Sequence, residues 1–387
     1  MTLATSARRT EPPIAGGWDR TQRVVIVSAS VGAGHDGAAA ELARRLRERG
    51  LRVDRYDFVD LLPGRLGRAL RWFYQAELKV APRSWDWLSH AFGHGRSPAR
   101  VAATMTRLAG ERLAALVDGD GTAETVAVVS TFPAASQVLG RLRRARRIRV
   151  PVTTFLTDAS VHPLWVADGV DAHLAIHEVA AAQARALGAT GVAVTGPAVG
   201  PGFRPARDDA ERAHARVAFG LPDGVPLALV VAGSWGVGDV AGAARDIAAT
   251  GLACPVVVCG RNTWLRRRLR RRAGIIALGW VADMPTLVRA CSLVVQNAGG
   301  LTSLEALTSG VPVLTYRCVP GHGRTNAAAL EQAGWAPWVH RRDDLPAALA
   351  AVAARTVDAL RASESLRATD PTRGILAVPA VGRASRR

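Results

Sequence analysis

A histidine lies in a glycine-rich segment near the start of the chain, and an imidazole there can take a proton from a hydroxyl group at neutral pH. The run RVVIVSAS leads into VGAGHDG, which contains Gly34 and His35, and apolar residues at helical spacing follow. This order predicts a strand, a glycine loop and a helix. His35 is expected on the loop at the carboxyl end of the strand, where open α/β sheets bind ligands. The alternative is a histidine that only caps the helix.

Two further glycine-rich segments follow apolar runs in the second half. LALVVAG leads into GSWGVG, and LVV leads into QNAGGLTS, which precedes the helical pattern LEALTSG. Backbone N–H groups at Gly300–Ser303 can hold a diphosphate at the start of a helix. Glu305, expected on the first turn, can accept two ribose hydroxyls. The combination predicts a site for a nucleoside diphosphate, whereas an acid that merely suits the helix dipole is the alternative for Glu305.

The elements that must position these residues follow a regular cycle. From Arg23 to about residue 360, short β-branched runs, glycine-rich breaks and amphipathic stretches alternate, which predicts an α/β fold with parallel sheets. The expected strands are Arg23–Ser28, Leu51–Tyr56, Thr125–Val129, Val152–Thr157, Ala172–Ile176, Leu227–Ala232, Val256–Cys259, Ile275–Leu278, Leu293–Val295 and Val313–Tyr316.

A segment rich in proline and glycine, GPAVGPGFRPARDD, separates the two halves and predicts a hinge. We therefore predict a disordered tail at 1–20, an N-terminal lobe at 21–198, a hinge at 199–209, a C-terminal lobe at 210–362 and a second polar tail at 363–387.

The composition sets broad limits on the partners. Fifty Lys and Arg against 32 Asp and Glu give a net charge of +18, and 49 % of the 387 residues are hydrophobic. Two sizeable cores are therefore possible, and the charge favours an anionic partner such as a phosphate ligand, an acidic lipid surface or nucleic acid. Because Lys79 is the only lysine, a GC-rich genome accounts for much of the arginine.

Targeting and metal-binding patterns are not found in the sequence. The four cysteines lack the spacing of a zinc site or a disulfide scaffold, the first 19 residues lack the apolar core of a signal peptide, and no apolar run is long enough to cross a bilayer. We expect a cytoplasmic protein that contacts the inner face of the cell membrane at most peripherally.

These segments resemble one enzyme family. VSASVGAGHDGAAAELARRL is similar to the N-terminal loop of the monogalactosyldiacylglycerol synthases and the bacterial processive diacylglycerol glucosyltransferases, and GWVADMPTLVRACSLVVQNAGGLTSLEALTSGVPVL is similar to their C-terminal lobe. The resemblance covers about Arg23–Ala350. It implies glycosyltransferase family 28: a GT-B fold with two Rossmann-like lobes whose parallel sheets face across a cleft, a UDP-sugar donor, no metal cofactor, and inversion at the anomeric carbon.

The resemblance also implies roles for individual residues. His35 would be the base that deprotonates the acceptor, and Asp158 a second candidate base or the group that orients the base; a strand-end cap is the alternative for Asp158. Gly34, His162 and Trp165 would lie on the acceptor side. The donor side would comprise Gly233, Ser234 and Gly236 at the phosphate and sugar, Arg261, Asn262 and Val281 at the uracil, Gly299, Gly300, Leu301 and Thr302 at the diphosphate, Glu305 at the ribose and His322 near the sugar.

Two regions bear on the substrates. Relatives usually carry Pro-Gly-Gln-Glu where this chain has PGHG at 320–323, so the sugar is not defined by the resemblance. In the stretch 64–92, Trp72 and Phe73 belong to an aromatic and basic amphipathic pattern. We expect it either to lie on an anionic membrane, with these two residues near the lipid acceptor, or to cover the core of the N-terminal lobe.

The sequence therefore predicts an enzyme that moves a hexose from a UDP-sugar to a lipid hydroxyl, with diacylglycerol as the expected acceptor. Transfer to a secondary metabolite and UDP-sugar epimerisation are the alternatives. A serine hydrolase is more remote: Ser234, Asp283 and His322 occur in the required order, but this function leaves GAGH and AGGLTSLEAL unused. The arginine clusters Arg141–Arg149 and Arg266–Arg272 are expected to be solvated helix faces, without nucleic-acid binding.

Overall fold

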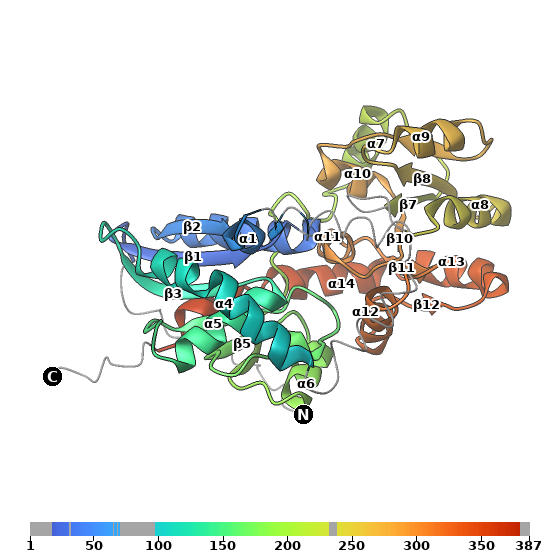
Figure 1. Cartoon of the computed structure of the whole chain (residues 1–387). Helices are drawn as coiled ribbons and strands as arrows, with labels where there is room; N and C mark the ends of the chain where they lie inside the picture. The colour runs from blue at the N-terminus through green and yellow to red at the C-terminus, as the bar shows by residue number, and fades with distance from the viewer. Residues whose placement is uncertain are drawn as a thin grey trace, which may run out of the picture.

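The computed structural model describes residues 18–30, 32–64, 66–67, 69, 97–231 and 238–379. They form two α/β lobes, each built on a six-stranded sheet in which all neighbouring strands are parallel (Figure 1).

The N-terminal sheet has the strand order β2 (Arg52–Asp57), β1 (Gln22–Ser28), β3 (Glu124–Ser130), β4 (Val152–Phe155), β5 (Ala172–Ala175) and β6 (Val192–Val194). The central residues of β1, Val24–Val27, are all apolar because both faces of this strand are covered. Val24 and Ile26 pack with α1 (Ala33–Glu48), whereas Val25 and Val27 pack with α4 (Ser97–Asp118) and α5 (Pro133–Arg144). Helix α6 (Glu178–Ala186) follows β5.

The C-terminal sheet has the order β12 (Trp338–Val339), β11 (Val313–Tyr316), β10 (Leu293–Gln296), β7 (Leu227–Val231), β8 (Cys254–Val258) and β9 (Ile276–Leu278). One face packs against α8 (Val240–Thr250), α9 (Thr263–Arg270) and α13 (Leu345–Ala353). The other packs against α10 (Met284–Ala290), α11 (Leu301–Thr308) and α12 (His322–Gln332). Helix α7 (Asp209–Ala218) contacts α10.

Both sheets reverse their strand order once, between β1 and β3 and between β10 and β7. Ligands of open α/β sheets bind at the carboxyl ends of the strands beside such a reversal. The segments that follow β1, β3, β7 and β10 are therefore the places to search for a site.

All ten strands that the sequence predicts are present, with bounds shifted by no more than two residues. The two strands that the sequence does not indicate, β6 and β12, lie at sheet edges and have only three and two residues. Such short edge strands carry no recognisable alternation of apolar and polar residues.

The predicted C-terminal tail is wrong over most of its described length. Helix α14 (Thr356–Arg367) packs on α11, and α15 (Pro371–Leu376) returns to the N-terminal lobe, where Ile375 is buried against α1 and the sheet. We call residues 356–376 the C-terminal strap. Its polar sequence suggests a tail because the partners that satisfy its charges come from distant parts of the chain.

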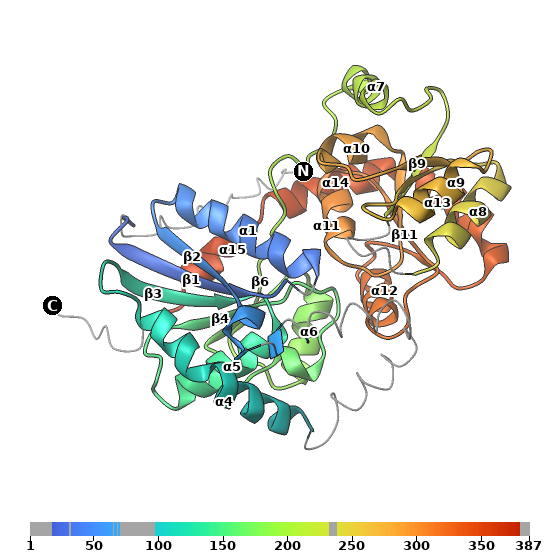
Figure 2. The ribbon, with the colours of Figure 1, turned by 45° about the horizontal axis from the view of Figure 1, so that its top comes forward.

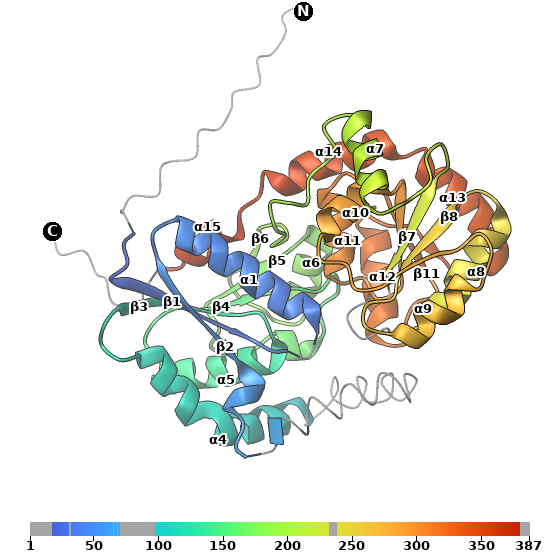
Figure 3. The same cartoon turned by 90° about the horizontal axis from the view of Figure 1, so that it is seen from above.

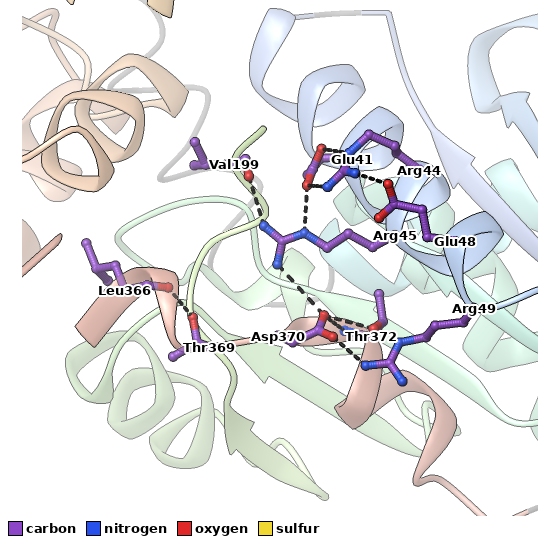
Figure 4. A network of polar contacts seen from close by, with 10 residues as sticks. All are labelled: Glu41, Arg44, Arg45, Glu48, Arg49, Val199, Leu366, Thr369, Asp370 and Thr372. Atoms are coloured by element: carbon purple, nitrogen blue, oxygen red, sulfur yellow. Dashed lines mark hydrogen bonds and ion pairs between the residues drawn. The ribbon is translucent and has the colours of Figure 1, made fainter. Parts of the chain in front are cut away.

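Asp370 fixes the strap to α1 (Figure 4). The Asp370 carboxylate accepts from the backbone N–H of Thr372 at the start of α15 (3.0 Å) and pairs with Arg49 (2.6 Å) and Arg45 (3.8 Å). Arg45 also donates to the carbonyl of Val199 (2.8 Å), in the segment 195–208 that joins the lobes. A cavity of about 490 Å³ lies beside this network and contains none of the predicted site residues.

Candidate functional site

The first turns of α1 and α11 meet where the two lobes touch (Figure 2). Helix α1 follows β1 and α11 follows β10, so each helix begins beside the order reversal of its own sheet. A Cβ on Gly37 would overlap the side chain of Leu301, which shows how closely the helices approach. The structure therefore brings the predicted histidine segment and the predicted diphosphate segment together.

His35 lies in the first turn of α1 and not on a loop, because the helix begins at Ala33. Its Nδ1 lies 2.8 Å from the carbonyl oxygen of Thr131, which follows β3, and 3.0 Å from Oγ1 of Thr157, which follows β4. A carbonyl can only accept, so Nδ1 carries the proton and the lone pair of the neutral ring is on Nε2. Burial lowers the pKa of His35, which keeps the imidazole neutral at pH 7.

Asp158 follows β4 and is held on both sides. One carboxylate oxygen accepts from the indole N–H of Trp165 (3.0 Å), and the other lies 3.3 Å from Nε2 of His322 in the opposite lobe. Burial alone would raise the pKa of Asp158, but the neighbouring His322 and His35 hold it well below its usual range. The carboxylate is a poor proton acceptor at neutral pH and an effective counter-charge for an imidazolium.

Trp165 is fully buried, with its ring 5.9 Å from that of His35. It can support His35 and Asp158 but offers no surface to an acceptor, so the predicted acceptor contact by its side chain is wrong in this conformation. His162 is half-buried, 6.1 Å from the Trp165 ring and 6.3 Å from the His322 ring. Burial, followed by the charge of His322, lowers the pKa of His162 to about 4, so its ring is neutral.

His322 begins α12 and has two partners at one nitrogen. Its Nε2 lies 3.3 Å from Asp158 and 3.0 Å from the side-chain amide nitrogen of Asn326. A protonated Nε2 donates to the carboxylate, whereas a neutral Nε2 accepts from the amide. Burial alone would lower the pKa of His322, but Asp158 raises it, which favours the protonated form and the contact between the lobes.

Asn326 is a site residue that the sequence argument did not single out. Its side-chain oxygen accepts from the backbone N–H and the hydroxyl of Ser160 in the N-terminal lobe (both 2.8 Å), and its amide nitrogen donates to the carbonyl of Ala298 (3.0 Å). It therefore links the N-terminal lobe to the segment before α11. Its only sequence signal is a polar side chain in the otherwise small and apolar run NAAAL.

The predicted diphosphate segment has the backbone geometry that its glycines suggest. Gly299 has a φ of +69°, and a Cβ there would lie 2.5 Å from Cβ of Asn326. Gly300 is the N-cap of α11. Apart from its two chain neighbours, no atom of the described residues lies within 4 Å of the place where its Cβ would be. Leu301 and Thr302 form the first turn, so their N–H groups face the end of the helix that favours an anion.

Glu305 is the fifth residue of α11 and lies in the second turn, not on the first as the sequence suggests. Burial raises the pKa of its carboxyl to about 7. Among the described residues, its side chain forms no hydrogen bond or ion pair. A half-buried carboxyl without a protein partner can still be reached by a ligand, and ligand hydrogen bonds would offset the cost of its partial desolvation.

The predicted uracil residues lie in the segments after β8 and β9. Arg261 is exposed, with its guanidinium 5.1 Å from the ring centre of Trp280. The side chain of Asn262 caps α9 by accepting from the N–H of Leu265 (2.9 Å), and Val281 is half-buried against the core. The remaining predicted site residues, Gly233, Ser234, Gly236, Trp72 and Phe73, lie outside the described residues.

The described members of the hydrolase alternative have other partners. Asp283 caps α10 through the N–H of Thr286 (3.1 Å), and His322 contacts Asp158. Within the described ranges, no group of three or more His, Cys, Asp or Glu side chains is arranged as metal ligands. In the same ranges, no helix is both long enough and apolar enough to span a membrane.

The sequence matches known proteins over both lobes. Residues 35–199 match the model of the monogalactosyldiacylglycerol (MGDG) synthase family. The chain is 27 % identical to the processive diacylglycerol beta-glucosyltransferase of Bacillus subtilis over 62 % of this chain and 63 % of that protein. It is 24 % identical to the enzyme of the same name in Bacillus cereus strain AH187, over 84 % of this chain and 83 % of that protein. These matches confirm the resemblance that the motifs suggest.

The first two curated relatives, from Bacillus pumilus and Bacillus subtilis, are matched over only 58 % and 63 % of their length. Solved structures cover more of the chain. HepE of Anabaena in complex with UDP and glucose has a TM-score of 0.53 at 12 % identity, over 91 % of this chain and 96 % of that one. MurG of Acinetobacter baumannii has a TM-score of 0.51 at 16 % identity, over 89 % and 94 %. The fold is therefore GT-B, as predicted.

Proposed function

We propose that this protein is an inverting glycosyltransferase that moves a hexose from a UDP-sugar to a lipid hydroxyl, with diacylglycerol as the acceptor. The observation that carries the proposal is the neutral imidazole of His35, with its lone pair on Nε2, beside the first turn of α11. The names of the relatives, diacylglycerol beta-glucosyltransferases, support the acceptor and a β-linked product.

The reaction needs one displacement at the anomeric carbon. Nε2 of His35 takes the proton of the acceptor hydroxyl while the acceptor oxygen bonds to the anomeric carbon and the bond from that carbon to the UDP oxygen breaks. The electron pair of the broken bond leaves with UDP. A positioned base of this kind contributes roughly a hundredfold to ten-thousandfold in rate.

The donor contacts are assigned to the C-terminal lobe. N–H groups at Gly300–Thr302 would hold the diphosphate and stabilise the charge that develops on UDP, without a divalent ion. The half-buried carboxylate of Glu305 would accept from the ribose hydroxyls, and Arg261, Asn262 and Val281 would border the uracil. His322 would lie near the transferred sugar.

Positioning is assigned to the residues that join the lobes. Asp158 is suited to hold His322 and to stabilise the His35 imidazolium that forms after proton transfer, and it is less suited to be the base because its pKa is low. The segment 199–209 would act as the hinge between an acceptor lobe at 21–198 and a donor lobe at 210–362. The protein would bind peripherally to the surface of a bilayer that contains the acceptor.

Product analysis tests the proposal. The purified full chain is incubated with detergent-dispersed diacylglycerol and each of several UDP-hexoses, and the lipids are analysed by mass spectrometry. We expect the mass of a hexosyl-diacylglycerol with at least one donor, and at least about a hundredfold less of it in the same time with His35→Ala. Conversion of a UDP-sugar at the same rate with and without lipid would contradict the proposal and favour an epimerase.

A further inference from the structure

Helix α9 lies at the rim of the C-terminal lobe (Figure 3). A tryptophan and several arginines of this helix are exposed to solvent. Leu265 and Leu269, four residues apart, are buried in the core. The opposite face therefore points outward, and 65 % of the Trp264 side chain is exposed. Arg267 and Arg268, three and four positions after this tryptophan, share its face, and Arg271 follows as the C-cap of the helix. We call these four residues the α9 patch.

The arginines of the α9 patch have no counter-charge among the described residues. All three are exposed, and within the described part of the chain none forms an ion pair with a carboxylate. Arg268 instead lies over the indole of Trp264, 5.2 Å from the ring centre. The neighbouring Arg266, Arg270 and Arg272 are also exposed and form no ion pair within this part of the chain. The electrostatic potential around the patch is therefore positive.

The second arginine cluster of the chain behaves differently. In the N-terminal lobe, Arg144 pairs with Asp168 (2.9 Å) and Arg147 with Glu111 (2.7 Å). These carboxylates reduce the local positive charge, and the exposed large aromatic residues of the described ranges, Trp264 and Trp280, both belong to the other lobe. The sequence predicts that both clusters are ordinary solvated helix faces, but the structure separates them by counter-charge and by exposed tryptophan.

The chemistry of the α9 patch fits an anionic membrane. Guanidinium groups attract acidic phospholipid headgroups. An exposed indole beside such groups would reach the membrane–water interface, where tryptophan is favoured in a bilayer. A second exposed tryptophan, Trp280, with 62 % of its side chain accessible and Arg261 over its ring, follows β9 in the same lobe. Each arginine close to an anionic surface strengthens binding about fivefold, which corresponds to ~1 kcal/mol.

We propose that the α9 patch is a docking surface by which the C-terminal lobe binds a membrane rich in anionic phospholipid. The biological use of this contact, delivery of the donor lobe to a lipid acceptor, rests on the proposed function, whereas the binding itself does not.

Vesicle sedimentation tests the docking surface. The full chain and the variant Arg267→Gln/Arg268→Gln/Arg271→Gln are mixed with vesicles of equal parts phosphatidylglycerol and phosphatidylcholine, or of phosphatidylcholine alone. A matched variant, Arg144→Gln/Arg147→Gln/Arg149→Gln, removes the same charge from the N-terminal cluster. We expect the α9 variant to bind the anionic vesicles about a hundredfold more weakly than the wild type, and the matched variant to bind with less than a tenfold loss.

Further measurements separate the outcomes. Trp264→Ala should weaken vesicle binding severalfold while the wild-type salt dependence is kept, because it removes apolar contact and not charge. Equal losses in the two arginine variants, or wild-type binding by the α9 variant, would overturn the proposal. The proposal would also be overturned if the wild-type protein bound single-stranded RNA but not vesicles, and if the α9 variant alone lost this RNA binding. Turnover of detergent-dispersed acceptor reports on the proposed function independently, and the α9 variant should keep it within about threefold of the wild-type rate.

Discussion

The two lobes prepare the candidate site in different ways. On the N-terminal side, His35 and Asp158 already have protein partners that fix their orientation and protonation: Thr131 and Thr157 for the imidazole, Trp165 and His322 for the carboxylate. On the C-terminal side, the half-buried Glu305 carboxyl has no partner among the described residues, and none of their atoms lies close to the side of Gly300 where a Cβ would point. The first arrangement suits groups that must act on a substrate, and the second suits groups that a ligand must complete.

The largest expected effect comes from removing the group that acts. His35→Ala should lower kcat by at least about a hundredfold, because the variant lacks the base that we propose for the acceptor hydroxyl. Affinity for UDP, measured by calorimetry, should stay within about threefold, since the proposed donor contacts belong to the other lobe. Near-normal kcat in this variant would exclude His35 as the base. A loss of UDP affinity as large as the loss of kcat would show that the N-terminal and C-terminal sides of the site do not act separately.

Asn326 connects the two sides, so its removal should affect the fold. Asn326→Ala leaves the N–H of Ser160 and the carbonyl of Ala298 without a buried partner, and should lower the free energy of unfolding by about 2 kcal/mol. Chemical denaturation measures this loss. Thr325→Ala is a suitable control, because the exposed Thr325 hydroxyl makes only partly buried or exposed contacts, to the Ser160 hydroxyl at 3.0 Å and to the carbonyl of His322 at 3.1 Å. Equal stability of the two variants would contradict a bridging role for the amide.

A substitution of Glu305 tests the C-terminal side of the candidate site, where this carboxyl has no partner among the described residues. Because burial raises its pKa to about 7, a donor whose ribose hydroxyls need the ionised carboxylate should bind more tightly as the pH rises from 6 to 8. Glu305→Gln should weaken UDP binding about tenfold at pH 8 and abolish this pH dependence. Isothermal titration of UDP at several pH values measures both effects. Unchanged affinity at pH 8 would remove Glu305 from the donor site.

The smallest effect is expected from the ion pair between the lobes. Since the folded-state pKa of His322 is raised, its stabilisation is complete below the unfolded pKa of about 6.5 and is lost as the pH rises through the folded value. The low pKa of Asp158 preserves the pair down to acidic pH. The free energy of unfolding of the wild type should exceed that of His322→Gln, and this difference should decrease as the pH rises from 6 to 9. It should not exceed ~1 kcal/mol, because 35 % of the His322 side chain is exposed and water screens the pair. An advantage that grows with pH would contradict this assignment.

Local sequence features predicted the elements and the meeting of two candidate site segments. Apolar runs interrupted by glycine define the ten strands, because a strand covered on both faces must be apolar and its end must turn. His35 and Gly299–Thr302 could be identified because each directly follows such a strand, and the carboxyl ends of parallel strands share one edge of a sheet.

Contacts between distant residues could not be predicted in this way. Ser160 and Asn326 are 166 positions apart, and nothing near either residue indicates the other. The Asp158 and His322 contact and the buried state of Trp165 depend on how the lobes are placed, and the two arginine clusters have similar local sequences but different counter-charges in space. The strap was mistaken for a tail for the same reason, since Asp370 meets Arg49 across 321 positions.

The chain passes between the lobes twice, at residues 195–208 and again at residues 368–370 of the strap. The two passages touch, because a Cβ on Gly196 would overlap the side chain of Thr369. Because the two covalent connections lie side by side, the C-terminal lobe can rotate about one axis that passes through them. The same connections hinder sliding or twisting of this lobe against the N-terminal lobe. A protein cut by a protease within 199–209 should therefore stay in one piece through Asp370 and its arginines, whereas a chain shortened to residue 367 would lose the single axis that keeps Glu305 aligned with His35.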